Sequence, residues 1–322
     1  MKWQTRVTKL FGIEYPIIQG GLAHLAYADL AAAVSNAGGL GQITAMSLPH
    51  PEHLRKEIQK VKRMTSKPFG INFAIGQHGR PYEEMVEVAI EEQVPVVSVT
   101  GGNPKHVLDK LVGQPMKKLV LVASKRQAIK AEELGADAVI VVGQEGGGHL
   151  GRADTGTFVL IPQVVDAVSI PVIASGGIID GRGFVASLAL GAEGIEMGTR
   201  FIATKECVDA HPMYQNAILA ADETATVVIK RSLGMPARAL KNQWTEEILK
   251  LEKAGKGYED LKTYISGVAN KRFIHDGDAE NGFGWAGQGA AGITDIPTVH
   301  ELVSRIVNEG NNIRQSLIKK EK

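Results

Sequence analysis

The chain is poor in cysteine, in aromatic residues and in net charge, and these shortages exclude several classes of protein. One of the 322 residues is cysteine, so neither an internal disulfide nor a multi-cysteine metal site can form, and a reducing compartment is indicated. We expect this residue, Cys207, to be a buried, unreactive thiol. Lys and Arg number 36 against 35 Asp and Glu, a net charge of +1. This balance gives no electrostatic reason to expect a nucleic acid or an anionic membrane as partner, and it favours a small-molecule ligand.

Long apolar runs are also missing. Residues 1–6 contain no apolar segment of the kind found in signal peptides, and no stretch is long enough to span a membrane. We therefore expect a cytoplasmic protein with no membrane contact. Hydrophobic residues still make up 44% of the chain against 22% charged, so a large core can be buried.

Short apolar runs rich in β-branched residues alternate with helical patterns over the first two thirds of the chain. Eight strands are predicted, at 15–19, 40–43, 69–73, 94–99, 119–122, 138–142, 171–174 and 194–197. Helical patterns lie between them at 27–37, 51–64, 82–92, 124–134, 157–168 and 182–190. This spacing suits a parallel strand followed by a crossover helix. Eight such units predict an α/β fold of the (β/α)8 TIM barrel type, with a doubly wound open sheet as the alternative that the pattern leaves open.

The alternation stops after residue 201. Residues 206–281 are mostly helical in pattern, with helix cores at 217–222, 246–253 and 258–268. We interpret them as an inserted, mainly helical lid or substrate domain over the barrel mouth. Residues 1–205 and 282–322 then form the barrel, including a second glycine-rich stretch at 282–292 and a terminal helix from about 298 to 318.

Glycine is concentrated in the loops that follow the predicted strands, where ligands bind in such barrels. Phosphate groups bind after strands seven and eight, where free N–H groups meet the anion. Those loops contain Ser175, Gly176 and Gly177, and Gly198 and Thr199, with Arg200 nearby in the sequence. A phosphate is therefore the best-supported ligand feature. Glu196 and Met197, at the end of the eighth strand, are further cofactor-binding candidates.

Residues 139–152 join the sixth strand to a loop with five glycines and one histidine, His149. Glycine at this density lets a backbone approach a flat or anionic ligand closely, so Gly147 and Gly148 are cofactor-binding candidates and His149 is the catalytic candidate. A ligand that is broad, planar and phosphorylated is indicated, and flavin mononucleotide (FMN) suits these demands. The amide of Asn72, at the end of the third strand, can contact the polar edge of such a ring.

Other barrel chemistries fit less well. A Schiff-base aldolase needs a lysine at a strand terminus. Strands five to eight end instead in Val122, Val142, Ala174 and Met197. Glu145, His149 and Glu196 have no recognised spacing of metal ligands, so we predict no metal. Cys207 lies past the eighth strand, outside the loops where a cysteine nucleophile would sit.

Taken together, these motifs resemble the nitronate monooxygenase family, formerly called 2-nitropropane dioxygenases, and its relative, the flavin-dependent enoyl-acyl carrier protein reductase II. The resembling stretches are YPIIQGG (15–21), AAAVSNAGGLG (31–41), KPFGIN (67–72), EGGGHLG (145–151), PVIASGGI (171–178) and GAEGIEMGTRF (191–201). The likeness continues weakly through 286–288 and covers nearly the whole chain. The order and spacing of the stretches are specific for the superfamily and much less specific for the member.

The resemblance implies FMN as cofactor. By position it implies Gly20, Gly21 and Leu22 behind the ring, Asn72 at its edge, and Ser175, Gly176, Gly177, Gly198 and Thr199 on the phosphate. His149 matches the family's catalytic histidine. In nitronate oxidation the flavin takes an electron from the nitronate, and O2 completes the reaction to a carbonyl compound and nitrite. The imidazole would remove the proton α to the nitro group of a nitroalkane, or steady the bound anion.

Two positions depart from the family pattern. Val142 and Glu196 each stand where many relatives have glutamine, and an ionisable Glu196 near a phosphate would turn away or recruit a cation. The main alternative function is an NAD(P)H-dependent flavin reductase acting on an enoyl thioester or a quinone, in which Arg80 of the loop 74–81 could meet the nucleotide phosphates. The co-substrate is accordingly O2 or NAD(P)H, and a homodimer is left open.

Overall fold

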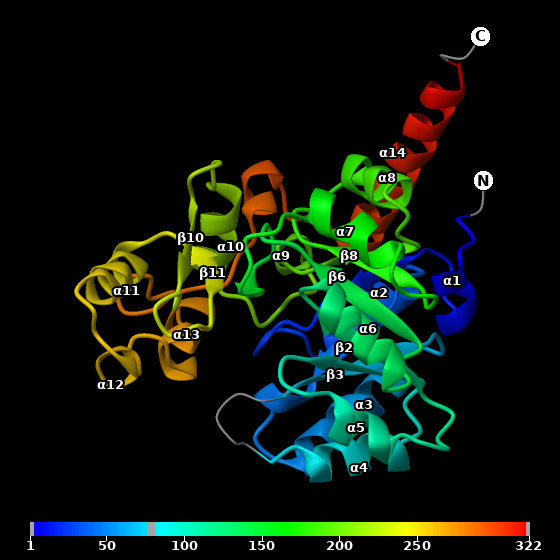
Figure 1. Cartoon of the computed structure of the whole chain (residues 1–322), viewed down its shortest axis with the longest axis horizontal. Coiled ribbons are helices and arrows are strands. Elements are labelled where there is room, and N and C mark those ends of the chain that lie inside the picture. Colours follow the sequence, from blue (N-terminus) through cyan, green and yellow to red (C-terminus); the bar gives the residue numbers. More distant parts are fainter. Residues whose placement is uncertain (1–2, 76–80, 320–322) are drawn as a thin grey trace.

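The computed structural model describes residues 3–75 and 81–319, so the predicted role of Arg80 lies outside the described residues. Eight parallel strands form one sheet in the order β1-β9-β8-β6-β5-β4-β3-β2 (Figure 1). They are β1 Ile17–Gln19, β2 Gly41–Thr44, β3 Phe69–Ala74, β4 Val96–Thr100, β5 Lys117–Val122, β6 Ala138–Val142, β8 Val172–Ser175 and β9 Gly194–Met197. A parallel bridge between Ile18 and Leu40 joins β1 to the residue before β2. The sheet closes through this bridge, and the predicted (β/α)8 barrel is confirmed.

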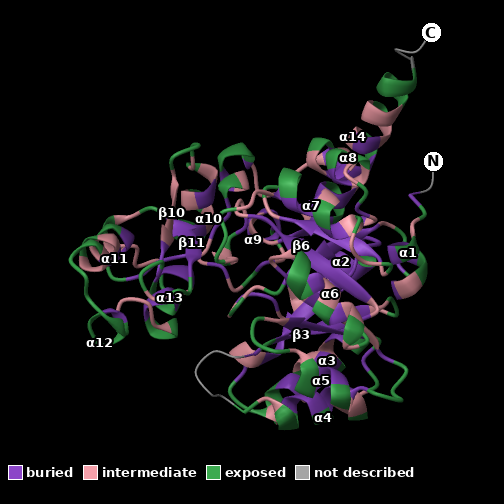
Figure 2. Ribbon diagram, in the orientation of Figure 1, coloured by how far each residue is buried: buried purple, intermediate pink, exposed green. Residues whose placement is uncertain are grey.

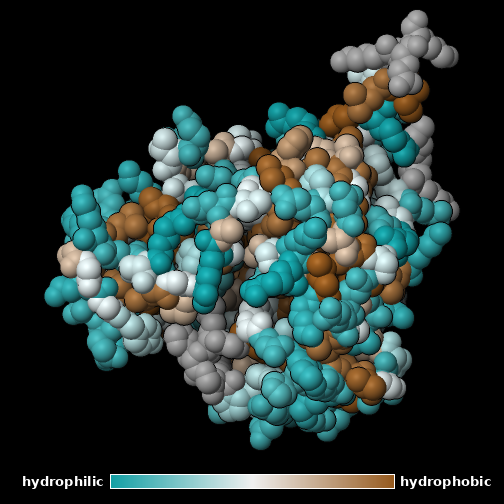
Figure 3. All heavy atoms as spheres, viewed as in Figure 1, coloured by the Kyte–Doolittle hydropathy of each residue, from teal (hydrophilic) through white to brown (hydrophobic). Residues whose placement is uncertain are grey.

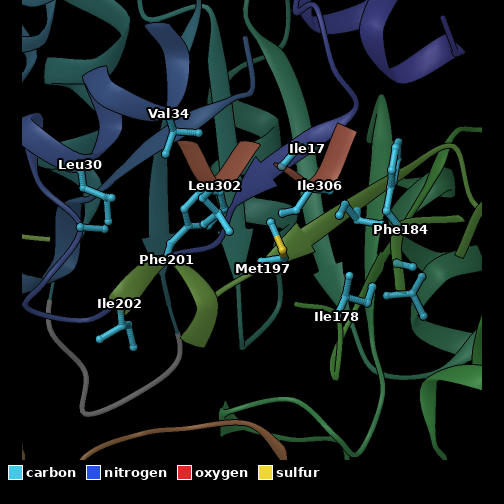
Figure 4. Packing of buried hydrophobic residues seen from close by; sticks show 14 of the residues in the cluster. Ile17, Leu30, Val34, Ile178, Phe184, Met197, Phe201, Ile202, Leu302 and Ile306 are labelled. Atoms are coloured by element: carbon cyan, nitrogen blue, oxygen red, sulfur yellow. The ribbon is translucent and has the colours of Figure 1, made fainter. Parts of the chain in front are cut away.

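Helices cover the outside of the sheet, and their inner faces are buried (Figure 2). They are α2 Ala28–Asn36, α3 Pro51–Met64, α4 Glu83–Glu91, α5 Lys105–Lys110, α6 Lys125–Glu133, α7 Thr157–Val165, α8 Gly181–Ala189, α9 Thr199–Ile202 and α14 Val299–Lys319, with 3-10 turns η1 Ala45–Ser47 and η2 Gln288–Gly292. The terminal helix α14 returns to the barrel wall, where Leu302 and Ile306 lie beside Ile17 and Met197 (Figure 4). Full burial of such side chains stabilises the fold by about 1.5–3 kcal/mol each.

The residues that point into the barrel change from apolar to polar along the strands. The apolar layer consists of Ile18, Leu40, Val96, Leu119, Ile140 and Ile173, and it packs against Val7 and Phe11 of α1 (Arg6–Phe11), which closes the N-terminal end. Two residues further along, the same faces present the buried polar side chains Gln42, Ser98 and Ser175, with Asn72 and Glu196 on the neighbouring strands. Because buried polar groups are costly unless they are paired, this layer marks the C-terminal end as the place for a ligand site.

The insertion contains more than helices. Its elements are α10 Pro212–Leu219, β10 Thr226–Ile229, β11 Ala237–Leu240, α11 Gln243–Lys253, α12 Tyr258–Leu261 and α13 Gly267–Ile274. β10 and β11 are antiparallel, and β11 also pairs with β7, residues Gly148–His149. The mainly helical prediction missed this strand pair because four-residue strands are too short to show a period. The division of the chain at 206 and 281, and a lid role for the insertion, stay predictions.

The single helix predicted over 258–268 is wrong. Its sequence forms α12 and α13 with a turn between them, because Ser266 caps a new helix by accepting the N–H of Ala269 on its Oγ at 3.1 Å. Helix α1 and the short α5 also escaped prediction.

The composition led to predictions about membrane-spanning segments and about Cys207. In residues 3–75 and 81–319, no helix is long and apolar enough to cross a membrane. The face shown in Figure 3 is mostly hydrophilic, with apolar side chains scattered among polar ones. Cys207 is 2% exposed, so the predicted burial of this thiol is confirmed, and burial raises its pKa to about 12.

Candidate active site

Asn72 lies at the C-terminal end of the barrel interior, beside the loop that follows β1. Its Nδ2 donates to Ser98 Oγ and to Thr100 Oγ1, both at 2.9 Å. A Cβ atom at Gly21 would lie 2.3 Å from Asn72 Oδ1. Glycine is therefore required for the loop to pass this amide, and the structure brings together two residues that were predicted for the same ligand ring.

Glu196 is a buried carboxyl group in the same layer. Ser175 Oγ donates to Glu196 Oε2 at 2.8 Å, and a Cβ at Gly20 would lie 3.1 Å from Oε1. Burial raises the pKa of this carboxyl group to about 7, although the hydrogen bond from Ser175 opposes the shift. Glu196 thus points into the barrel beside the predicted ring-backing loop. The Ser175 hydroxyl donates its proton to Glu196, so in the loop 175–177 the backbone N–H groups are the donors left for the predicted phosphate.

The loops after β8 and β9 present unpaired backbone donors. Within the described part of the chain, the N–H groups of Gly176, Gly177 and Gly198 have no protein acceptor. Gly176 and Gly177 have φ of +103° and +75°, which glycine adopts at little cost. At Gly176 a Cβ would also lie 2.9 Å from Thr157 Oγ1. Three free donors at the positions where barrels bind phosphate form an anion cradle.

Arg200 does not contribute to this cradle. Its Nη2 donates to the carbonyl oxygens of Ala203 and Asp295, each at 2.7 Å, and its Nη1 lies 3.3 Å from Asp295 Oδ1. The guanidinium therefore ties α9 to the segment before α14, and the cradle depends on backbone dipoles.

The glycine loop after β6 is fixed to the start of α7 by Glu145. The Thr157 N–H donates to Glu145 Oε1 at 3.0 Å and to Oε2 at 2.8 Å, and Thr157 Oγ1 donates to Oε2 at 2.9 Å. A carboxylate at a helix N-terminus is electrostatically favourable. Glu145 therefore has a structural role, and it places the following glycines next to the cradle, since a Cβ at Gly177 would lie 3.2 Å from Glu145 Cβ.

The second glycine-rich stretch packs across these loops. The Gly287 N–H donates to Thr199 Oγ1 and the Gln288 N–H donates to the Glu145 carbonyl, both at 2.9 Å. A Cβ at Gly147 would lie 2.6 Å from Gly287 N, so Gly147 serves close packing between the two loops. The hydroxyl of Thr199 accepts from Gly287 and keeps its own proton available for an anion.

His149 is positioned by the insertion. It lies in β7, where it pairs with Ala237 of β11. Its ring centroid is 5.6 Å from that of Trp285, and Trp285 itself bridges to Ala239 of β11. His149 and Trp285 thus pair with the same edge of β11, whose other edge is taken by β10.

Lys230 was not predicted, but its side chain hydrogen-bonds His149. Its Nζ lies 2.7 Å from His149 Nε2 and 5.3 Å from the centroid of the Trp285 ring. Lys230 is 5% exposed. Burial lowers the pKa of its ammonium to about 8, and the charge of Glu252 opposes the shift. A buried lysine beside a histidine is a feature of functional sites, but a lysine 81 residues further along the chain gave no local signal.

The remaining predicted residues are placed as follows. Leu22 lies next to the cradle, since a Cβ at Gly198 would be 3.3 Å from its Cδ2. The side chain of Met197 is buried among apolar residues between the sheet and the surrounding helices (Figure 4). The Met197 carbonyl accepts the Gly20 N–H at 3.0 Å. Gly148 has φ +71° and no atom within 4 Å of an added Cβ, so its glycine serves the backbone turn before His149.

The fold and this arrangement are those of a barrel enzyme with its site at the C-terminal ends of the strands. The nitronate monooxygenase family matches residues 4–79 and 74–309. A probable nitronate monooxygenase from Staphylococcus aureus is 36% identical, with 97% of this chain and 99% of that protein covered. The chain belongs to the nitronate monooxygenase family of flavin-dependent oxidoreductases.

Two solved structures are similar over the whole chain. FabK from Thermotoga maritima has a TM-score of 0.92 and 40% identity, covering 98% of this chain and 99% of that one. Nitroalkane oxidase from Streptomyces ansochromogenes has a TM-score of 0.83 and 28% identity, covering 97% and 100%. The two relatives have different names, so similarity alone does not choose the reaction.

Proposed function

We propose that this chain binds FMN and oxidises alkyl nitronates with O2 to a carbonyl compound and nitrite. The observation that supports this best is the convergence of the Gly176–Gly177–Gly198 cradle and His149 on one end of the barrel. The loops after β6 and β8 are in contact, since a Cβ at Gly176 would lie 3.2 Å from Gly146 N. If a phosphate group binds to the cradle, the other atoms of the same ligand would lie in the same opening of the barrel as His149.

The residues present fit the phosphate and ring of FMN. The three free N–H groups and the Thr199 hydroxyl would hold the phosphate, while Gly20 and Gly21 would let the ring approach the backbone beside Asn72. When bound, FMN supplies the one-electron acceptor for the nitronate. The chain supplies the anion-binding side chains His149 and Lys230, and the aromatic wall of Trp285.

The choice of a nitronate as substrate is supported by charge. A nitronate is a small anion, and the cationic side chain of Lys230 hydrogen-bonds His149. A cation and an imidazole on one side of a ring site favour a ligand of opposite charge. This argument concerns binding, and it is independent of the phosphate cradle.

The test is to mix the purified protein, without oxygen, with propyl-2-nitronate, NADH and NADPH in separate experiments. We expect a yellow protein whose flavin absorbance is bleached by the nitronate within seconds, and nitrite release once O2 is admitted. The variant H106A, which changes an exposed histidine of α5, should behave as wild type. A colourless protein that takes up no FMN, or a flavin that the nitronate leaves unchanged, would contradict the proposal.

A second candidate is an NAD(P)H-dependent reductase of an enoyl thioester or a quinone. It would use the same FMN site, and similarity does not decide between the two, since FabK is 40% and nitroalkane oxidase 28% identical to this chain. Fast bleaching by NADH or NADPH alone, together with no response to the nitronate, would establish this function in place of nitronate oxidation.

A further inference from the structure

Lys230 is a buried cation that hydrogen-bonds a histidine side chain. No carboxylate of the described residues forms an ion pair with its Nζ, which lies 2.7 Å from His149 Nε2. Taking an ammonium group out of water without a carboxylate partner costs free energy. The buried charge next to the imidazole therefore lowers the stability of the folded protein. Such a loss of folding stability is typical of functional sites.

The backbone around Lys230 is built to aim its side chain. Lys230 has φ +63°, a left-handed conformation that costs a non-glycine residue about 1 kcal/mol or more. Glu252 of α11 holds the turn, because its carboxylate accepts the N–H groups of Lys230 and Ser232, both at 2.9 Å.

The same small sheet carries both partners. Ile229, which precedes Lys230, pairs with Ala237, and Ala237 pairs with His149 across β11. The pairing of β10, β11 and β7 thus brings the backbone next to Lys230 close to that of His149.

The other charged groups around Lys230 are occupied. Arg231 pairs with Asp154 at 2.9 Å. Arg238 of β11 donates through Nε and Nη2 to the Gln144 carbonyl, at 3.1 and 3.0 Å. Both arginines thus contact acceptors other than His149, and Glu252 is bound to the backbone of the turn.

An ammonium group has three donors and no acceptor. At 2.7 Å it can only donate to Nε2, which must then offer its lone pair, so the proton of the neutral imidazole is on Nδ1. We propose that Lys230 is a positioning residue that holds His149 as the Nδ1–H tautomer, so that the imidazole acts on an anionic ligand as a hydrogen-bond donor and not as a base. This inference rests on the proposed function for its ligand, but the tautomer itself can be measured without any substrate.

The consequence for substrate choice is specific. A nitronate anion needs a donor, whereas a neutral nitroalkane needs a base for its α-proton. While the Lys230 contact is made, Nε2 cannot take that proton. We therefore expect nitronates to be oxidised at least tenfold faster than the parent nitroalkanes.

The experiment is two-bond 1H–15N NMR of the holoenzyme labelled with 15N-histidine, in which the two neutral tautomers give different patterns; the His149 signals are assigned by their loss in H149Q. The variants are K230M, which removes the donor, K230R, which keeps a permanent cation, and K250M, which changes an exposed lysine of α11 as control. We expect the Nδ1–H pattern in wild type, K230R and K250M, and the Nε2–H pattern in K230M. Nitronate kcat should fall about 10- to 100-fold in K230M and stay at the wild-type value in K250M.

A wild-type Nε2–H pattern, or a K230M pattern equal to wild type, would overturn the proposal. A titration of the wild-type protein covers the case in which K230M does not fold: above pH 8, where Lys230 loses its proton, the pattern should move towards Nε2–H, and a constant pattern from pH 6.5 to 9.5 would also overturn it. Failure of the proposed function looks different, because the nitronate would then leave the flavin unchanged whatever the tautomer.

Discussion

The two halves of the candidate site are built by different means. The cradle consists of backbone groups in loops that directly follow β8 and β9, so it depends on glycines at 176, 177 and 198. The His149 side consists of side chains brought together by β11, with Lys230 and Trp285 far away in the sequence. The comparison teaches that the cradle can be formed by barrel loops alone, whereas the His149 side also needs Lys230 and β11 of the insertion to pack against it.

The largest effect should come from removing the imidazole. We expect H149A to lower kcat for nitronate oxidation by about 100- to 10,000-fold, because a positioned proton donor or acceptor contributes on this scale. Flavin content should stay at the wild-type level, since the cradle is built from other loops. Nitrite release and flavin absorbance measure the two quantities separately. If turnover is unchanged in H149A, the His149 half has no part in the chemistry.

The next effect breaks the cradle and leaves the histidine in place. In G176A the new Cβ would lie 2.9 Å from Thr157 Oγ1 at φ +103°, and strain of about 1–3 kcal/mol corresponds to FMN binding weakened about 5- to 150-fold. G135A is the matched control, because Gly135 has φ +83° but no atom within 4 Å of an added Cβ. Fluorescence titration of the apoprotein with FMN compares them. Equal affinity in G176A and wild type would show that the phosphate binds elsewhere.

A smaller effect concerns stability on the His149 side. The folded-state pKa of Lys230 is lowered to about 8 from 10.5, so the unfolded chain binds this proton more tightly, and the wild-type free energy of unfolding should rise between pH 8 and 10.5. K230M removes the buried charge. We expect it to be more stable than wild type by about 1–3 kcal/mol at pH 7, with the gain fading towards pH 10.5. Urea unfolding with K250M as control measures this, and a destabilised K230M at pH 7 would contradict the assigned burial cost.

The smallest effect concerns Glu196 on the barrel side. Its folded-state pKa is raised to about 7 from 4.5, so the folded apoprotein binds this proton more tightly than the unfolded chain and loses stability as the pH rises from 4.5 to 7. E196Q should therefore be more stable than wild type by about 1–2 kcal/mol above pH 7 and equal to it below pH 4.5. E133Q changes an exposed carboxylate and serves as control. A gain that does not vary with pH would show that the carboxyl group is not the cause.

The same comparison explains what the sequence could and could not predict. The eight strands and the cradle were predictable because each strand and the loop after it lie within one short stretch, as in PVIASGGI at 171–178. His149 was selected for the same reason, because it lies in the glycine loop directly after the sixth strand, and its catalytic role stays a prediction. Lys230 and Trp285 were not, because their approach to His149 is created by the pairing of β10, β11 and β7, and two four-residue strands in a charged segment show no period.

Two polar side chains near the cradle make contacts that their positions in the sequence did not indicate. Arg200 follows the cradle in the sequence, but its guanidinium turns to Asp295. Ser175 was predicted at the phosphate as part of the loop 175–177, and its hydroxyl donates to Glu196 on the neighbouring strand. In both cases the partner comes from a different strand or loop, which local reasoning does not see.

The most direct test of the account is a crystal structure of the protein grown with FMN. We expect the phosphate within hydrogen-bond distance of the Gly176, Gly177 and Gly198 N–H groups, and the ring across the strand ends between Gly21 and His149. FMN bound at any other place, or with its phosphate away from these three donors, would contradict the central claim that the barrel loops hold the cofactor beside the histidine.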